Sequence, residues 1–349
     1  MQKKIIALAI AAAFAAPVAA MADVTVYGVV DGNFRSATSA GSTSNTMNSF
    51  AGLNSNRWGV KSSEDLGDGM KANVGLEGDL FTATGVDSSS GAAPTAGQIF
   101  SRQSTVGLEG GFGKIDLGRQ YTVAFKMNTL IDPFGHQFIG LTSANYASGF
   151  TLSAVPIKPI TRNDSDISYT GKFGDVTVMA DKSMGSTGYD TGATAAAGVS
   201  YVSGPITAVV TYSKIKPTVA TVTTDVTHLQ VGGGYNFGDG SVKVGYAQQK
   251  NADSNGTGGT SVGNDATTTS MWLGGNFNVS SKIGVTAAYY KLTSAYTGAT
   301  DVVTTNIVAA ATYALSKKTA LYVEADKQSV DTSPTTDTNG YTVGMNVAF

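Results

Sequence analysis

The chain reads Lys71-Ala72-Asn73-Val74-Gly75-Leu76-Glu77-Gly78-Asp79-Leu80, and polar or glycine residues alternate there with apolar or glycine residues. This period of two is typical of a β-strand with one apolar and one polar face, whereas a helix repeats every 3.6 residues. The same alternation recurs at 206–213, 242–247 and 321–325, and no helical period competes with it. The sequence therefore predicts an all-β protein.

Short turns and longer loops alternate along the chain. The short turns fall at 64–69, 110–113, 171–175, 202–205, 237–240, 278–282 and 315–319, and the longer polar stretches at 36–48, 84–98, 122–162, 185–193, 216–224, 250–267, 293–302 and 329–338. These connections predict sixteen strands, although fourteen or eighteen also fit the uncertain boundaries. An even strand count, short periplasmic turns and long external loops are typical of outer-membrane β-barrels.

The composition narrows the class of protein. The 349 residues carry 23 basic and 25 acidic side chains, and this balance argues against nucleic acid as the main partner. Cysteine is absent, which excludes a disulfide scaffold, a thiolate zinc site and a cysteine nucleophile. No run of 18 apolar residues follows the N-terminal region, so we expect no membrane-spanning helix in the mature chain.

The N-terminal segment is predicted to be a cleaved signal peptide. Lys3 and Lys4 precede an uncharged apolar run, and Ala20-Met21-Ala22 forms a small-x-small cleavage site. We expect cleavage after Ala22, which leaves residues 23–349 as the exported domain. An uncleaved helical anchor is the alternative interpretation of residues 1–22.

A closed barrel explains the alternation physically. In hydrocarbon each backbone N–H and C=O needs a partner within the protein, and a closed sheet provides one without leaving an edge. One face of each strand then meets lipid and the other meets a wet lumen. Phe112, Phe173, Phe237 and Phe349 lie at short turns or at the chain end, where they would form part of a periplasmic aromatic girdle. A soluble β-sandwich is the alternative.

Several segments resemble the general porins of the Gram-negative outer membrane, most closely the β-proteobacterial type. These segments are the opening strand Val24–Asp31, the stretch Asn56–Gly67 (NRWGVKSSEDLG), Arg102–Leu108 (RQSTVGL) and Gly118–Thr122 (GRQYT), together with an alternating C-terminus that ends in Phe349. The resemblance covers essentially the whole mature chain, with the motifs in the family's order. It implies a homotrimer of sixteen-stranded antiparallel transmembrane barrels, each with its own diffusion pore.

The resemblance also implies a pore constriction. Residues 122–162 take the position of the family's third external loop, which folds into the barrel and narrows it. Asp132, Pro133, Phe134 and Gly135 resemble the turn at the tip of that loop. Arg57, Arg119 and Arg162 take the positions of arginines on the opposite wall.

The direction of these arginines is only partly readable from the strand pattern. Alternation places Arg57 on the wet face, but Arg119 shares its phase with Ile115 and Leu117, so its inward direction depends on the resemblance or on a bulge. Each arginine could instead be a solvated lumen residue without a role in selectivity. Three arginines against Asp132 would leave about +2 near the constriction, which favours anions over cations by ~1.3 kcal/mol, or nearly tenfold.

Catalytic interpretations are weak. His136 and His228 are far apart in sequence, and no carboxylate stands at a helical metal-ligand spacing from either, so we interpret both as solvated lumen or loop residues. Neither a P-loop nor a Gly-x-Ser-x-Gly elbow is present. We expect no enzyme activity, no cofactor and no metal site.

The sequence thus predicts a passive channel for small hydrophilic solutes and ions in the Gram-negative outer membrane, with a mild anion preference. The expected partners are two further copies of the chain, outer-membrane lipid and lipopolysaccharide, and the outer-membrane insertion machinery, which the resemblance implies would recognise Phe349. The alternatives are a substrate-specific outer-membrane channel and, from a different class, an exported β-rich adhesin or lectin.

Overall fold

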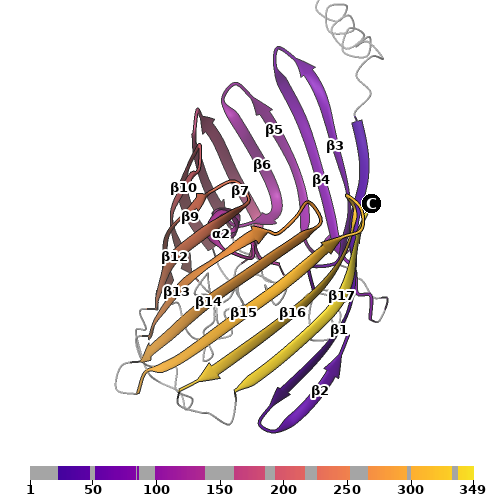
Figure 1. Cartoon of the computed structure of the whole chain (residues 1–349). Coiled ribbons are helices and arrows are strands. Elements are labelled where there is room, and N and C mark those ends of the chain that lie inside the picture. Colours follow the sequence, from indigo (N-terminus) through magenta and orange to yellow (C-terminus); the bar gives the residue numbers. More distant parts are fainter. Residues whose placement is uncertain are drawn as a thin grey trace, which may run out of the picture.

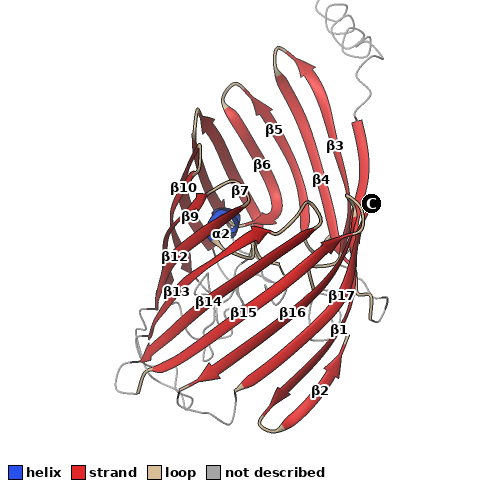
Figure 2. Ribbon diagram, viewed as in Figure 1, coloured by secondary structure: helices blue, strands red, loops and turns tan. Residues whose placement is uncertain are grey.

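The computed structural model describes residues 23–47, 52–83, 85, 99–137, 161–184, 193–216, 226–251, 266–296, 300–331 and 337–349. The expected signal peptide, residues 1–22, lies outside the described residues. Within the described part of the chain, seventeen strands form one sheet (Figures 1 and 2). They are β1 (Asp23–Ser39), β2 (Ser42–Thr46), β3 (Arg57–Gly67), β4 (Met70–Asp79), β5 (Gln103–Gly110), β6 (Gly113–Tyr121), β7 (Arg162–Phe173), β8 (Val176–Ser183), β9 (Ala193–Ser203), β10 (Ile206–Lys216), β11 (Val226–Asn236), β12 (Gly240–Asn251), β13 (Ala266–Asn278), β14 (Ile283–Tyr296), β15 (Val302–Ala314), β16 (Thr319–Val330) and β17 (Thr338–Ala348).

The first strand closes the sheet. Residues Asp23–Val29 of β1 pair with β3, and residues Val29–Ser39 pair with β17, both antiparallel. From β3 onward each strand pairs with its neighbours in chain order, so the wall returns to its starting point as a barrel. A single closed sheet rules out the two stacked sheets of a sandwich.

Strand β2 is a departure from the expected loop at 36–48. Strand β1 continues to Ser39, and β2 folds back on it as a hairpin, pairing with Arg35–Ser39. Ala40 and Gly41, between the two strands, have φ of 51° and 76°, as a type I′ hairpin turn requires. This hairpin extends beyond the wall, which leaves sixteen described strands in the closed barrel and confirms the predicted count.

The two faces of the wall differ as the alternation predicted. On β10, Val210 and Tyr212 are 45% and 51% exposed, whereas Thr211 and Ser213 between them are 1% and 3% exposed. The exposed apolar side chains form the outer face, and the polar side chains line the lumen. The outer face is therefore an apolar belt around the barrel, and such a belt is suited to contact with the hydrocarbon of a membrane.

The aromatic residues at the short turns lie at one end of the barrel. Phe112, Phe173, Phe237 and Phe349 are all between 43% and 62% exposed. The C-terminus lies at this end with the short turns (Figure 1). This arrangement fits an aromatic girdle at the periplasmic boundary.

A helix forms the start of the segment that we expected to be a long loop. Helix α2 (Val123–Ile131) begins after Thr122, whose side chain accepts a hydrogen bond from the backbone N–H of Phe125. Its nine residues are too few to produce a convincing helical period in the sequence. Residues 138–160 lie outside the described residues, so the rest of the expected loop is not placed.

In the described ranges, no helix is both long enough and apolar enough to cross a membrane.

Asp31 joins the strands that meet at the closing seam. Its carboxylate is fully buried and accepts hydrogen bonds from the Tyr322 hydroxyl on β16 (2.5 Å), the Asn346 amide on β17 (3.2 Å) and the Asn33 amide (3.0 Å). The backbone N–H of Asn54, just before β3, donates to the same carboxylate at 3.3 Å. One side chain thus links the first strand, the last two strands and the segment that enters β3.

Replacement of Asp31 should weaken the closed barrel. Asp31→Ala leaves the buried Tyr322 hydroxyl and the Asn33 and Asn346 amides short of an acceptor, which costs about 2–4 kcal/mol in the free energy of unfolding. The measurement is the temperature at which the folded band converts to the unfolded band in detergent gels. Asp239→Ala, at an exposed turn, is the matched control and should leave this temperature unchanged. Equal conversion temperatures for the two variants would contradict the role given to Asp31.

Candidate functional site

A paired charge cluster lines the lumen face of β3 and β4. Glu77 and Asp79 are two residues apart on β4, so both point inward, and they are 7% and 1% exposed. Nε of Arg57 lies 3.7 Å from Oε2 of Glu77, and the Tyr27 hydroxyl donates to the same oxygen at 2.9 Å. The structure therefore places Arg57 in the lumen, next to an acid.

Arg102 is the centre of this cluster and was missed in the sequence. Its Nε lies 2.6 Å from Oε1 of Glu77 and its Nη1 lies 2.8 Å from Oδ1 of Asp79. The residue immediately precedes β5, so the strand alternation assigns it no direction. The sequence indicated Arg102 only indirectly. Glu77 and Asp79 both point inward from β4, and two buried carboxylates need a cation close by, such as an arginine at the start of the neighbouring strand.

Arg119 lies at an irregularity in the wall. The pairing of β6 with β7 shifts register between Gly118 and Gln120. Arg119 forms an ion pair with Asp164, and its Nε donates to the backbone carbonyl of Ser101 at 2.6 Å. Its side chain is 17% exposed. Arg119 is thus paired beside the cluster rather than extended into open space.

Arg162 joins the cluster through an aromatic ring instead of a carboxylate. Its Nη2 donates to the Tyr121 hydroxyl at 2.8 Å, and its guanidinium carbon lies 4.3 Å from the centre of the Tyr121 ring. Nη2 of Arg102 donates to the same hydroxyl at 2.6 Å. Tyr121 therefore brings Arg102 and Arg162 together, and none of the ion pairs found between described residues involves Arg162.

A stack of rings continues from Arg162 towards the turn after α2. The Tyr121 ring stacks on Phe125 at 4.6 Å, and Phe125 stacks on His136 at 4.1 Å. Burial of the imidazole lowers the pKa of His136, so this ring is neutral at neutral pH. His136 is therefore packed in the stack and partly buried, rather than solvated as we expected, and His228 on β11 is fully buried. The positive charge of the stack belongs to Arg162.

Helix α2 begins beside this cluster, where its Phe125 stacks on Tyr121, and extends along the lumen wall away from it. Its buried face contacts β9 and β10, and the Trp272 indole on β13 donates to the Ile131 carbonyl at 2.9 Å. The Gln230 amide on β11 donates to Asn128. Val123, Met127 and Ile131 are each at most 1% exposed and belong to one apolar cluster with Trp272. The segment after β6 thus crosses to the far wall and is fixed there.

The turn after α2 is held by Asp132. Its carboxylate is fully buried and accepts hydrogen bonds from the Tyr290 hydroxyl at 2.7 Å and from the His136 backbone N–H at 2.8 Å. Nζ of Lys243 donates to the Asp132 carbonyl at 3.0 Å. Pro133 and Phe134 are buried, and Gly135 has a φ of 57°. The Asp132 carboxylate therefore faces wall residues.

Further acids lie beside the N-terminus of α2. Asp116, Asp166 and Asp181 point inward from β6, β7 and β8 and are all less than 10% exposed. Asp181 accepts a hydrogen bond from the Val123 backbone N–H at 2.9 Å, and Lys114 pairs with Asp116 at 2.9 Å. Asp181 is therefore engaged by the helix and Asp116 by a lysine, whereas Asp166 accepts a hydrogen bond from the Asn163 amide. Among the described residues, no group of three or more His, Asp or Glu side chains is arranged to hold a metal ion.

The C-terminal residue lies on the outer side of the closing seam. Phe349 is 53% exposed, and its backbone N–H donates to the Gly28 carbonyl at 3.0 Å. Its ring covers Gly28, where any side chain would collide with it. Asn346 and Thr342 on β17 face the lumen, whereas Tyr341, Val343 and Met345 are exposed.

Comparisons with known proteins agree on one family. A sequence profile described as Gram-negative porin matches residues 7–333. Outer membrane porin protein 32 of Delftia acidovorans is 30% identical over 92% of this chain and 88% of its own length. An outer membrane porin protein of Bordetella pertussis is 28% identical over 62% of this chain and 60% of its length. The solved anion-selective porin from Comamonas acidovorans has a TM-score of 0.78 at 25% identity and covers 94% of this chain and 100% of its own.

Loss of the Asp132 carboxylate should loosen the segment after α2. Asp132→Ala removes the acceptor of the Tyr290 hydroxyl and of the His136 N–H, so backbone amides in residues 123–137 should exchange hydrogen roughly tenfold faster. Exchange followed by mass spectrometry measures this. Asp175→Ala, at an exposed turn, should leave the exchange unchanged. Unaltered exchange in Asp132→Ala would show that Asp132 does not anchor the segment.

Proposed function

The chain belongs to the Gram-negative porin family, and we propose that it is a passive diffusion channel for small hydrophilic solutes and ions across the outer membrane, with a mild anion preference. One observation carries the proposal. A closed barrel with an apolar outer belt encloses a lumen that holds an arginine-rich cluster, and α2 extends from Tyr121 beside that cluster to Trp272 on β13. Polar groups placed around a restricted aqueous path select by size and by charge.

The alternatives fit the same observation less well. A substrate-specific channel with an aromatic slide needs rings spaced along the path, whereas Tyr121 and Phe125 are stacked on each other. An exported adhesin or lectin has no use for an outer belt that is apolar all round the barrel. A lumen lined by paired charges and varied polar groups provides no dedicated binding site for one solute, so it suits unspecific diffusion.

The acids in the cluster weaken the electrostatic field in the lumen. The field is smaller than the one expected from Arg57, Arg119 and Arg162 with Asp132 as the single acid. Arg57, Arg102, Arg119 and Arg162 stand against Glu77, Asp79 and Asp164, which leaves one positive charge. A unit charge roughly 6 Å from an ion in water contributes about 0.7 kcal/mol, and salt screening reduces this to about 0.3 kcal/mol. Anions are then favoured over cations by about 0.6 kcal/mol, or nearly threefold.

Planar-bilayer recording tests both the channel and its selectivity. The purified protein should give stepwise conductance, and in a dilute KCl gradient the reversal potential should correspond to a two- to fourfold preference for chloride. Arg162→Gln removes the arginine that has no carboxylate partner among the described residues, so the preference should fall close to unity.

Lys318→Gln is the matched control for charge. It removes one positive charge from an exposed turn outside the lumen, and its reversal potential should equal that of the unaltered channel. The absence of any conductance would refute the channel itself. A cation-selective potential in the unaltered protein, or an identical shift in both variants, would refute the role of the arginine cluster.

We further propose that the whole segment 122–162 narrows the lumen, with Asp132, Pro133, Phe134 and Gly135 forming the turn that seats it. The contacts of α2 and of Asp132 with the far wall support this assignment. Arg57, Arg119 and Arg162 would then form the opposite side of the constriction, together with Arg102. The Asp132 carboxylate would serve as an anchor and contribute little to the field.

Family membership supports the remaining parts of the proposal. We propose that residues 1–22 are a signal peptide cleaved after Ala22 and that the mature chain forms a homotrimer. Its outer face would contact lipid and lipopolysaccharide. The insertion machinery would recognise the alternating last strand that ends in Phe349.

Phe349→Ala should lower the amount of folded protein in the membrane severalfold. The channels that do form should keep their conductance and selectivity, because Phe349 lies outside the lumen. Quantitative gels of unboiled membrane samples measure the yield. Val343→Ala, an equally exposed site on β17, is the control and should give a near-normal yield. A normal yield from Phe349→Ala would exclude the C-terminal ring as an assembly signal.

A further inference from the structure

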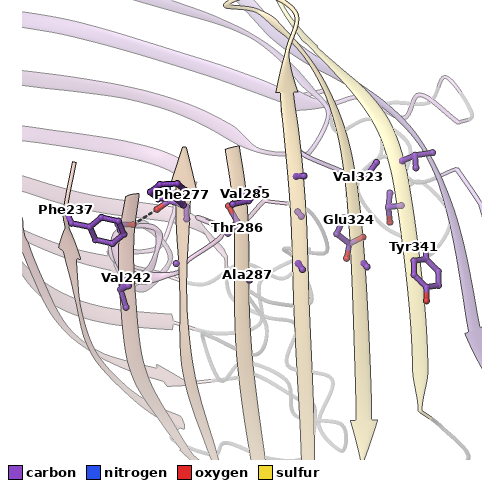
Figure 3. A pocket seen from close by; sticks show the side chains of 18 residues that line it. Phe237, Val242, Phe277, Val285, Thr286, Ala287, Val323, Glu324 and Tyr341 are labelled. Carbon is purple, nitrogen blue, oxygen red and sulfur yellow. Dashed lines mark hydrogen bonds between the residues drawn. The ribbon is translucent and has the colours of Figure 1, made fainter. Parts of the chain in front are cut away.

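An apolar hollow of about 730 Å³ lies on the outer face of β12 to β17 (Figure 3). Its floor is formed by Gly275, Ala287, Ala309 and Ala325, which lie directly opposite one another on four successive strands. Because neighbouring strands are about 4.8 Å apart and three such steps separate Gly275 from Ala325, this floor is about 14 Å long. The hollow is thus a groove that crosses the strands.

Larger side chains form the two sides of the groove. Leu273, Tyr289 and Ile307 occupy the next outward positions beside the floor on β13, β14 and β15, at 44% to 56% exposure. Phe277, Val285 and Val323 stand on the other side. Figure 3 shows Phe237 and Phe277 at one end and Tyr341 at the other. The groove therefore has sides, a floor and two ends.

The groove rises from the periplasmic boundary towards the middle of the membrane. Gly275 lies near the end of β13 at Asn278, close to the short turn, whereas Ala325 lies in the middle of β16. Short turns mark the periplasmic end of such a barrel. An acyl chain of the periplasmic leaflet follows the same course, from the head-group region towards the bilayer centre.

The turns below the groove carry positive charge. Lys282, between β13 and β14, and Lys317 and Lys318, between β15 and β16, are exposed. None of the three takes part in an ion pair between described residues. In contrast, Glu64 and Asp65 at the end of β3 and Asp68 in the turn that follows are acidic. Three exposed lysines therefore stand at the periplasmic edge beside the groove, against one exposed acid, Asp239, in the turn next to Phe237, and this excess of positive charge complements an anionic head group.

We propose that this groove binds one acyl chain of an anionic phospholipid of the periplasmic leaflet, with the phosphate held near Lys282, Lys317 and Lys318. A continuous floor one residue wide fits a linear alkyl chain. A second copy of the barrel fits the groove less well, because its individual side chains would need individual depressions and not one continuous floor. The site is independent of the lumen, so it adds a lipid-binding function to the proposed channel.

Native mass spectrometry of the purified protein, incubated with phosphatidylglycerol or with phosphatidylcholine, tests the proposal. The unaltered protein should retain phosphatidylglycerol preferentially. Ala287→Leu/Ala309→Leu fills the floor and should lower retention of both lipids roughly tenfold, since several methylene contacts are lost. The matched control, Ala195→Leu/Ala197→Leu on the outer face of β9, should retain lipid normally.

The lysine variant separates the head group from the chain. Lys282→Gln/Lys317→Gln/Lys318→Gln changes only exposed turns, and it should retain the two lipids about equally. Conductance should be unchanged in all variants, so a failed channel and a failed lipid site give different results. Equal retention by every variant would overturn the proposal, as would loss of the oligomer in Ala287→Leu/Ala309→Leu, which would identify the groove as a subunit interface.

Discussion

Closure of the backbone hydrogen-bond network between β1 and β17 is the constraint on which the rest of the structure depends. In hydrocarbon an unpaired strand edge cannot be hydrated, so the first strand must satisfy both of its neighbours. β1 does this by pairing with β3 up to Val29 and with β17 from Val29 onward. Its length of 17 residues follows from this double duty. Asp31 lies just past the changeover and links the strands that close there.

Closure also separates two solvents, and each face then follows its own rule. The outer face can be apolar without further specification, whereas charged groups buried on the inner face are stabilised by opposite charges, hydrogen bonds or aromatic rings. Glu77 and Asp79 on β4 are held by Arg102, and Arg102 shares the Tyr121 hydroxyl with Arg162. The resulting cluster has a small net charge, because most of its cations neutralise acids. A mild selectivity is the physical consequence of a lumen that has to be stable as well as charged.

The sequence was sufficient for the wall and insufficient where local geometry departs from regular strands. Alternation and turn residues predicted sixteen strands, because both are properties of short segments. The hairpin of β1 and β2 was taken for a loop, since Ser, Thr and Asn are typical of loops and its pairing depends on the Ala40-Gly41 turn. The direction of Arg119 could not be derived, because it follows the register shift at Gly118. Arg102 was missed for a related reason, as it precedes its strand.

The sequence did indicate where α2 packs inside the barrel, through apolar residues at inward positions of two strands that break the simple alternation. Met271-Trp272-Leu273 on β13 and Ile307-Val308-Ala309 on β15 are apolar at every position, inward ones included. Trp272 and Val308 point inward and are 2% and 0% exposed, and Trp272 holds the Ile131 carbonyl at the end of α2. An apolar inward residue facing water would gain nothing from its position. A break in the alternation of a barrel strand therefore marks where protein, rather than water, lies against the inner wall.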